Sequence, residues 1–402
     1  MVYLASGGFW LGLDQVGGAL ISFLLAIAFA RYVPKDVYGT YRYLLSAFWV
    51  LTAFTFTGLP TALSQAVARG KEGAYRTSFL PSLLGGIPLA LIALGVGIYY
   101  YLAGNGALAL AFAVIALLGP FFQPAYLFGS FLVGRKEFRA NSLFGLVLYA
   151  VPSLALFATM LATKNPISFL AAYLGSNIVT GILLTFVAWN LWRPGGVPDP
   201  EVRKLGAHFS AMNLLSTLAQ QIDKLVVFHY LGAVELAVYA FATALPEQIK
   251  GVFNSVSVLA LPKFVARPFN EVRANFWNRL WLFTGALVLV AFLYIAVAPL
   301  AFRIFFPAYT EAIFFSQIYA LSLIPIGNAL PITLLQAREA KRELYIYNVL
   351  SPVCQIAALV FLTGAYGLMG AVVARIFGRA LNLALGGVLL EGYTRRREAI
   401  AK

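Results

Sequence analysis

Charged residues are scarce in this chain of 402 residues, because only 11% are Asp, Glu, Lys or Arg while 61% are hydrophobic. Soluble proteins average about 25% charged and about 45–50% apolar residues. The composition therefore excludes an ordinary soluble enzyme and a disordered chain. Together with a mean hydropathy of +0.83, it predicts a polytopic α-helical membrane protein.

The residues that metal binding and acid–base catalysis require are also rare. The one cysteine, Cys354, lies inside an apolar run, so no internal disulfide can form. With two histidines and four aspartates, we expect no metal site, no cofactor and no enzymatic activity. A membrane-bound glycosyltransferase or glycan polymerase would need paired carboxylates or a large external loop, and the predicted external loops are short and poor in acids. The first eight residues contain no Lys or Arg, which argues against a cleaved signal peptide.

Long apolar runs predict twelve membrane-spanning helices. About 20 apolar residues cross the hydrocarbon core, and these runs lack the alternating pattern of a membrane β-barrel. The predicted spans cover residues 9–31, 40–67, 77–103, 106–132, 141–163, 167–192, 205–231, 234–262, 275–300, 309–336, 344–364 and 367–392.

Basic residues gather in alternate connections between these spans. The connections after even-numbered spans and the C-terminus hold 20 of the 29 Lys and Arg, whereas the odd connections and their margins hold 5. This asymmetry predicts a multi-pass protein of the cell membrane with both termini in the cytoplasm. It also accounts for most of the net charge of +14 without a polyanion, so we expect no nucleic-acid partner.

A Pro- and Gly-rich segment, LWRPGGVPDPEVRK at 191–204, separates two halves of six spans each. The predicted domains are an N-terminal lobe at 1–192, a cytoplasmic linker at 193–204, a C-terminal lobe at 205–392 and a cytoplasmic basic tail at 393–402. Val67-Ala68-Arg69 matches Val265-Ala266-Arg267 at an offset of 198 residues, which indicates a repeat that preserves orientation. The predicted fold class is therefore all-α, with twelve helices in two parallel-repeat six-helix lobes around a central cavity, an arrangement suited to alternating access.

Two segments, 29–71 and 220–265, resemble the polysaccharide transport family of the multidrug/oligosaccharidyl-lipid/polysaccharide flippase superfamily. The resemblance rests on Tyr38-Gly39-Thr40-Tyr41, on the Ile222-Asp223 pair, and on Leu231-Gly232 followed by Val238-Tyr239. It implies a flippase that moves polyprenyl-(di)phosphate-linked oligosaccharide from the cytoplasmic to the outer leaflet, through a cavity lined mainly by spans 1, 2, 7 and 8. The implied partners are the lipid-linked glycan and membrane lipids, with a glycan polymerase or glycosyltransferase as a further candidate.

Polar residues form a stripe along each of spans 7 and 8. Steps of three and four residues place each set on one helix face, and such a face turned to lipid would be costly. We expect the stripes to line the cavity, although hydrogen bonds between packed helices are an alternative use of these residue types. The stripes comprise Ser210, Asn213, Thr217, Gln220 and Lys224, and Thr243, Glu247, Lys250, Asn254 and Ser257.

Span 12 carries Arg375 and Arg379, followed by Asn382. Each arginine at mid-membrane costs about 2.5–3.5 kcal/mol on insertion scales, so the pair needs an anion. Glu247, Asp223 and a substrate phosphate are the candidates, and the planar guanidinium suits phosphate oxygens. A buried salt bridge between helices is the alternative.

The remaining candidate charges lie in the first lobe and at its outer edge. Arg31 and Arg42 flank the first external turn, either as outer-gate phosphate ligands or as ordinary surface charges. Asp14 is a candidate for cation coupling, as the resemblance to drug exporters implies, or it pairs with an arginine or stays hydrated. Together with these three, the candidate groups of the pathway comprise six cations and three acids, so the pathway is net cationic. The others are Lys224, Lys250, Arg375 and Arg379, and Asp223 and Glu247. A cationic pathway attracts anions and disfavours the alternative function, a multidrug cation exporter.

Overall fold

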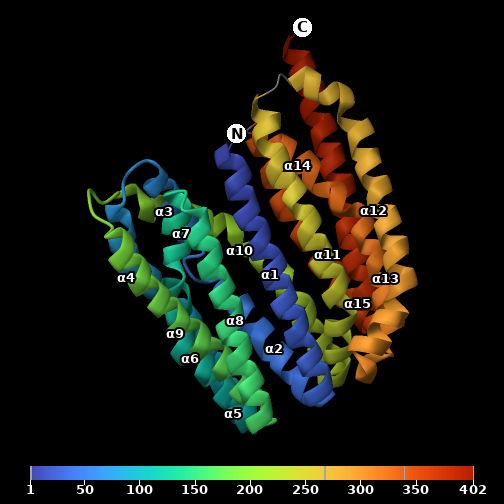
Figure 1. Cartoon of the computed structure of the whole chain (residues 1–402). Coiled ribbons are helices and arrows are strands. Elements are labelled where there is room, and N and C mark those ends of the chain that lie inside the picture. The colour runs from blue at the N-terminus through green and yellow to red at the C-terminus, as the bar shows by residue number, and fades with distance from the viewer. Residues whose placement is uncertain (1, 267–268, 339, 402) are drawn as a thin grey trace. The chain divides into compact units, whose positions relative to one another are not determined.

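The computed structural model describes residues 2–266, 269–338 and 340–401, and in these ranges every regular element is a helix (Figure 1). The predicted all-α class is therefore confirmed. The chain divides into two compact units, Met1–Gln221 and Ile222–Lys402, which we describe separately as unit 1 and unit 2. The border lies within helix α10, and the lobe, linker and tail boundaries expected from the sequence stay predictions.

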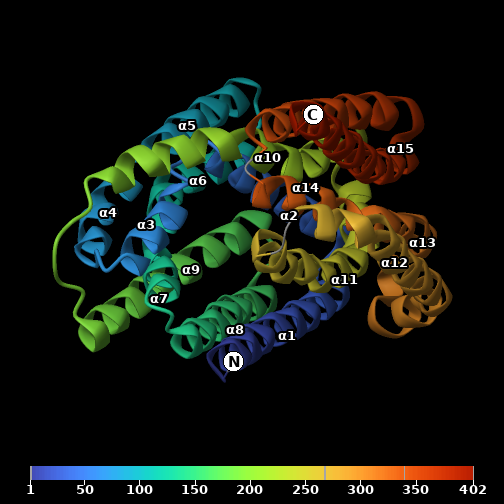
Figure 2. The same ribbon diagram turned by 90° about the horizontal axis from the view of Figure 1, so that it is seen from above.

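Unit 1 contains nine helices and the first part of a tenth. Figure 2 shows α1 and α8 side by side, and these two helices form one of the most extensive contacts of the unit. The helices are α1 (Val2–Tyr32), α2 (Lys35–Thr52), α3 (Leu59–Ala68), α4 (Gly73–Leu84), α5 (Ile87–Leu102), α6 (Gly106–Ala125), α7 (Leu127–Gly134), α8 (Phe138–Ala162), α9 (Pro166–Trp192) and α10 (Glu201–Leu231).

Three predicted single spans of unit 1 are each divided into two helices. The span at 40–67 unwinds over residues 53–58 between α2 and α3, the span at 77–103 breaks between α4 and α5, and the span at 106–132 breaks between α6 and α7. Pro60, Pro88 and Pro124 lie beside these breaks, because a proline lacks the N–H that a helix interior needs. A Cβ on Gly86 would lie 2.5 Å from the Cα of Pro120, so the α4–α5 turn requires a glycine.

Unit 2 begins with the end of α10 and is dominated by long helices. Its last helix is divided at Gly367, whose positive φ of 59° favours glycine, and we refer to its two parts as the arms of α15. The helices are α11 (Ala233–Ala266), α12 (Phe269–Phe305), η1 (Pro307–Tyr309), α13 (Ala312–Ala320), η2 (Leu321–Asn328), α14 (Ala329–Ala337) and α15 (Lys341–Ala401).

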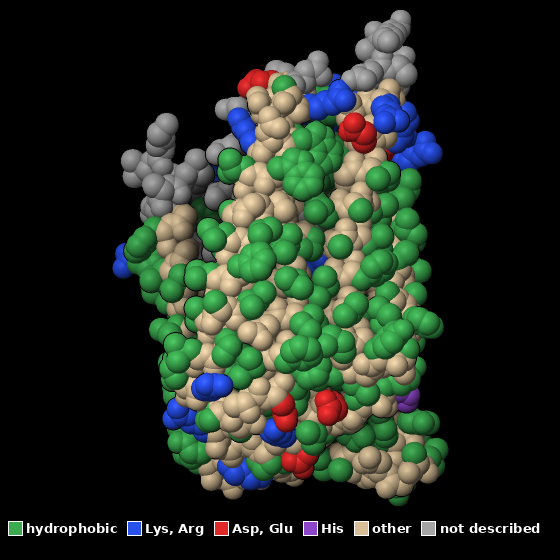
Figure 3. Space-filling model, turned by 90° about the vertical axis from the view of Figure 1, so that its right-hand side faces the viewer, with side chains coloured by type: hydrophobic (Ala, Val, Ile, Leu, Met, Phe, Trp, Pro, Cys, Tyr) green, Lys and Arg blue, Asp and Glu red, His purple; other side chains and the backbone are tan. Residues whose placement is uncertain are grey.

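Eight helical segments in the described ranges are long and apolar enough to cross a membrane, and the last of them contains both arms of α15. The chain is therefore a multi-pass membrane protein. On the face drawn in Figure 3, hydrophobic side chains cover the middle and charged side chains gather towards the two ends. The helices α2, α10 and α11 are not among the eight. The count of twelve spans stays a prediction for them.

The segment between α9 and α10 is anchored to unit 1 rather than loose. Asp199 is buried and accepts ion pairs from Arg69 at 3.1 Å and Lys71 at 3.2 Å. Burial raises the pKa of Asp199, but hydrogen bonds from the Glu201 backbone and from the two cations outweigh this effect and hold the pKa below its usual value. One carboxylate thus ties the predicted linker to the α3–α4 turn.

Candidate functional site

A network of charged side chains fills the interior of unit 2. It begins at Asp223 of α10, which is 3% exposed. Arg375 of α15 donates to its Oδ2 from Nη2 at 2.7 Å and from Nε at 3.0 Å. The hydroxyl of Tyr239 donates to the same oxygen at 2.9 Å, and the Lys224 Nζ lies 4.0 Å from Oδ1. This first pair joins α10, α11 and α15.

A second pair lies one helical turn further along α15. Arg379 forms an ion pair with Glu247 of α11 and donates to the Oγ of Ser322 at 2.6 Å. Lys250 contacts the other Glu247 oxygen at 3.0 Å, while the hydroxyl of Tyr319 also donates to Glu247. The guanidinium stands 5.3 Å from the centre of the Tyr319 ring, an arrangement that favours a cation.

The two acids neutralise only half of the cations in this network. Asp223 and Glu247 face Lys224, Lys250, Arg375 and Arg379, which leaves two positive charges. Both arginines form salt bridges between helices, which was the alternative to phosphate binding. Their role as phosphate ligands stays a prediction. The side chains of Glu247 and Lys250 are 38% and 33% exposed, so this end of the network is open to a ligand.

The polar stripes contribute to packing as well as to exposed surface. Thr243 is buried and donates to the Tyr239 carbonyl at 3.0 Å. Asn213 is exposed, and Thr217 donates to its carbonyl at 2.9 Å. Gln220 is exposed. The side chain of Asn254 lies outside the described part of the chain, so that candidate has no structural account.

Two further polar positions are used to join helices within one unit. Ser210 accepts a hydrogen bond from the Gly58 backbone N–H at 2.9 Å, which fastens the first part of α10 to the start of α3. Asn382 accepts hydrogen bonds from Ser351 and from Gln355, which joins the two arms of α15. The cavity-lining role expected of Asn382 stays a prediction.

In unit 1, Arg42 lies inside α2 rather than at its outer end. It is seven residues after the first residue of the helix, or about 10 Å along the axis. Its Nε is buried without a hydrogen-bond partner, and among the described residues no carboxylate forms an ion pair with it. The groups that its charge affects include the hydroxyls of Tyr38, Tyr41 and Tyr173. Arg31, by contrast, is exposed at the end of α1.

Sequence reasoning missed the amide and phenol groups of unit 1. Tyr126 donates to the Oδ1 of Asn177 at 2.5 Å, and Gln123 donates to the Phe56 carbonyl at 2.6 Å while accepting from Thr55 at 2.9 Å. Gln123 stands in an otherwise apolar helix, and that isolation was the signal that could have found it, whereas Asn177 lies among other polar residues of α9.

Asp14 lies at the contact between α1 and α8. A Cβ on Gly145 of α8 would lie 2.3 Å from the Asp14 Oδ1, so the glycine provides the space for this carboxylate. The Oδ1 is buried and has no hydrogen-bond partner. No group of three or more His, Cys, Asp or Glu gathers in the described part of the chain. Asp14 is therefore a lone acid, and its coupling role stays a prediction.

Residues 4–267 match the family described as "Polysaccharide biosynthesis protein". No curated protein matches the chain. Among solved structures, an outward-facing MATE family multidrug resistance transporter of the MOP superfamily is 15% identical with a TM-score of 0.67, covering 97% of this chain and 95% of its own. An inward-facing MATE family transporter gives the same identity and TM-score, with 94% and 96% covered. Lipid II flippase MurJ, in an inward closed conformation, is 16% identical with a TM-score of 0.65, covering 97% and 87%. These likenesses show that the chain has the MOP transporter fold.

Proposed function

Because this chain belongs to the polysaccharide biosynthesis protein family, we propose that it is a flippase for polyprenyl-(di)phosphate-linked oligosaccharide. It moves this lipid from the cytoplasmic to the outer leaflet and catalyses no covalent chemistry. The likeness to lipid II flippase MurJ supports a lipid-linked glycan as the substrate class. The predicted orientation, with both termini in the cytoplasm of a cell membrane, follows from the basic residues in alternate connections.

The observation that carries this proposal is Arg42 inside α2, whose Nε is buried without a hydrogen-bond partner. A charged group within a membrane protein is costly unless it is paired or serves a mobile ligand. Tyr38, Tyr41 and Tyr173 provide hydroxyl groups but no negative charge. An anionic phosphate that arrives and leaves would satisfy Arg42 through bidentate hydrogen bonds.

The network of unit 2 provides the second phosphate-binding area of the proposal. Its surplus of two positive charges, with Lys250 and Glu247 partly exposed, favours an anion over a cation. A phosphate would compete with Glu247 for Lys250 and Arg379, so binding would exchange one set of ion pairs for another. This surplus disfavours a cation exporter as the alternative.

The proposed mechanism is alternating access by the two lobes. The MATE family transporters of the same fold have outward-facing and inward-facing structures, which supports two states for the MOP fold. An anionic headgroup that leaves a negative cell interior gains about 2.3 kcal/mol per charge for each 100 mV. The membrane potential therefore provides a driving force, and protonation or cation binding at Asp14 is a second source of coupling.

The test is a flipping assay in proteoliposomes with a labelled polyprenyl-diphosphate oligosaccharide, whose arrival in the far leaflet is read by an added glycosidase. We expect Arg42→Ala to lower the flipping rate at least tenfold, since a charged hydrogen-bonded contact contributes about 1.5–3 kcal/mol. Arg42→Lys keeps the charge but loses the planar fork, so an intermediate rate is expected. Arg303→Ala, which removes an exposed arginine from the last turn of α12, is the control.

Charge reversal of both Arg375 and Arg379 is expected to abolish glycan export while the protein stays in the membrane. Because each arginine is also an ion-pair partner, thermal unfolding of the variant must be measured beside its export. Full flipping by Arg42→Ala would contradict the phosphate-binding role. Flipping no faster than in protein-free vesicles, together with transport of cationic drugs, would refute the substrate class.

A further inference from the structure

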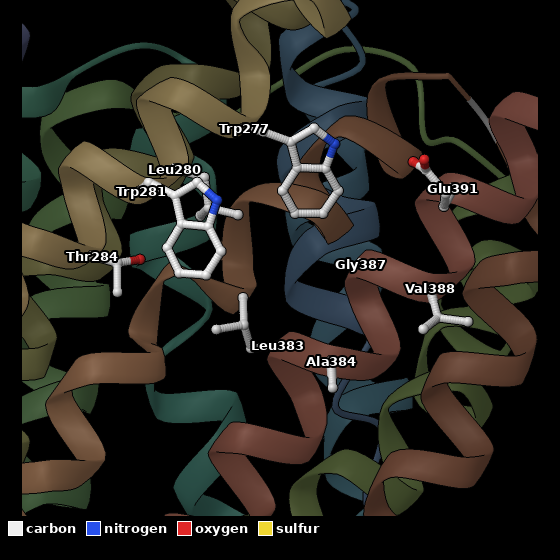
Figure 4. A pocket seen from close by; sticks show the side chains of 9 residues that line it. All are labelled: Trp277, Leu280, Trp281, Thr284, Leu383, Ala384, Gly387, Val388 and Glu391. Carbon is white, nitrogen blue, oxygen red and sulfur yellow. The ribbon is translucent and has the colours of Figure 1, made fainter.

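A groove of about 370 Å³ lies between α12 and the second arm of α15, entirely within unit 2 (Figure 4). Its volume is within the range of small-molecule sites. One wall is formed by side chains of α12 and the other by side chains of α15, and the figure shows both indole rings beside the space between the helices. The walls include Trp277, Leu280, Trp281, Leu383, Val388 and Glu391.

The groove opens on the outer face of a spanning helix. Trp281 is 65% exposed and Val388 is 69% exposed, and α12 is one of the segments apolar enough to cross a membrane. Gly387 creates the space, because a Cβ there would lie 3.3 Å from the Trp277 ring. Tryptophan is enriched where lipid headgroups meet hydrocarbon, so the groove lies at the depth of the upper part of a lipid chain.

One end of the groove carries two charges without partners. Glu391 lines the groove, and Arg395 follows it by four residues on the same helix face. The spacing would allow the two to pair with each other, yet no ion pair involves either side chain among the described residues. A negative group that lines the groove and an exposed positive group thus stand one turn apart on α15.

The other end of the groove carries an unsatisfied hydroxyl. Thr284 lines the groove, is 8% exposed, and its Oγ1 has no hydrogen-bond partner. A buried threonine in a helix usually donates to the carbonyl four residues earlier, whereas here that bond is absent. The hydroxyl therefore has no partner among the described residues, and the lipid proposed below does not use it.

We propose that this groove binds a zwitterionic membrane lipid whose headgroup carries a phosphate and a primary ammonium. Its hydrocarbon chain lies between Trp277 and Leu383, its ammonium pairs with Glu391, and its phosphate pairs with Arg395. A primary ammonium supplies hydrogen-bond donors to a carboxylate as a lysine does. The site is independent of the proposed flippase function.

The negative charge of Glu391 discriminates between membrane lipids according to the charge of their headgroups. A lipid with phosphate as its only charged group, which includes the proposed polyprenyl-phosphate substrate, would place like charge beside this carboxylate. The same holds for a lipid with a glycerol headgroup. Only a headgroup that carries both signs satisfies Glu391 and Arg395 together.

The experiment measures quenching of tryptophan fluorescence by lipids with brominated chains. The protein is placed in phosphatidylglycerol vesicles, and brominated phosphatidylethanolamine, phosphatidylglycerol or phosphatidylcholine is then added in steps. The signal of Trp277 and Trp281 is obtained as the difference from a variant with both changed to Phe. We expect half-maximal quenching at a mole fraction about two- to fivefold lower for the ethanolamine lipid, the ratio typical of a partly exposed ion pair.

Two kinds of variant separate the headgroup from the chain. Glu391→Gln should remove the headgroup preference and leave the quenching itself, whereas Gly387→Leu should reduce quenching by every lipid. Val388→Phe fills the same space from the exposed wall without adding a tryptophan, if Gly387→Leu does not fold. Leu282→Ala, at a position that is 79% exposed on α12 and does not line the groove, is the control.

Three results would overturn the proposal. The first is an equal midpoint for the ethanolamine and glycerol lipids in the unmodified protein, and the second is a preference that survives in Glu391→Gln. The third is an equal midpoint for the choline lipid, since a quaternary ammonium has the charge but lacks the N–H donors on which the pairing with Glu391 depends.

Discussion

The Asp223–Arg375 pair permits the sharpest test of how unit 2 is held together. In Asp223→Asn the carboxylate charge disappears, while Arg375 and Lys224 keep theirs. Side-chain exposure is 4% for Asp223 and 21% for Arg375, so water cannot replace the lost partner easily. Removing one member of a buried pair costs about 3–5 kcal/mol, and we expect a loss of that size.

The loss is measurable as a shift in thermal unfolding. Unit 2 covers Ile222–Lys402, and for domains of this size each kcal/mol shifts Tm by about 2–4 °C. The predicted decrease is therefore about 6–20 °C for Asp223→Asn in detergent, followed by tryptophan fluorescence. The double variant Asp223→Asn/Arg375→Gln removes both charges and should recover most of the loss, because a neutral pair leaves only Lys224 to be solvated.

A decrease of less than about 2 °C in Asp223→Asn would refute this reasoning. It would mean that Arg375 is satisfied without Asp223, by water or by another anion. Failure of the double variant to recover stability would refute it in a second way, since the cost would then come from packing rather than from charge. Glu311→Gln, a change of the same chemistry at an exposed acid, is the control.

Three further predictions concern other parts of the chain. Asp199→Asn should make the segment at 193–200 several-fold more sensitive to an added protease at pH 7. Since the Asp199 pKa is below 3.8 in the folded protein, the unmodified linker should stay protected above that pH and open only as the pH falls through the lowered pKa. Gly370→Ala should abolish folding, because its Cβ would lie 1.8 Å from the Leu362 carbonyl oxygen, which expression and gel filtration would show. Gly145→Ala should displace the Asp14 carboxylate and remove any response of flipping to a pH gradient as fully as Asp14→Asn does, while retention of the response in either variant would exclude coupling at Asp14.

Composition and periodicity were sufficient for the helical class, whereas the polar stripes as the lining of a cavity stay a prediction. Long apolar runs have one stable form in a membrane, and steps of three and four residues define a helix face. Residues three apart on a helix are neighbours, which is the spacing of the Glu247–Lys250 contact. The breaks inside three predicted spans of unit 1 did not follow, because hydropathy is insensitive to a helix that unwinds and resumes.

The partners of the two arginines could not be chosen from the sequence. Asp223 and Glu247 were both candidates, but pairing depends on which helices pack together, and this is a tertiary property. Arg42 shows the same limitation, because the sequence could not tell that it would have no acidic partner among the described residues. Its position near the end of a predicted span suggested surface charge, whereas the helix begins at Lys35 and carries it inside. Unpaired charge becomes visible only when every neighbour is placed.

The sequence separation within the unit 2 network has a consequence for biosynthesis. Asp223 precedes Arg375 by 152 residues and Glu247 precedes Arg379 by 132. At about 5–20 residues per second, the ribosome takes roughly 7–30 seconds to deliver the arginines after the acids have been made. Glu247 has Lys250 as an early local partner at 3.0 Å, whereas Asp223 has the more distant Lys224 at 4.0 Å and the neutral hydroxyl of Tyr239 until the last helix is made. Newly made α10 should therefore enter the bilayer fully only once α15 has been synthesised, and chains truncated before Gly367 should be removed by quality control.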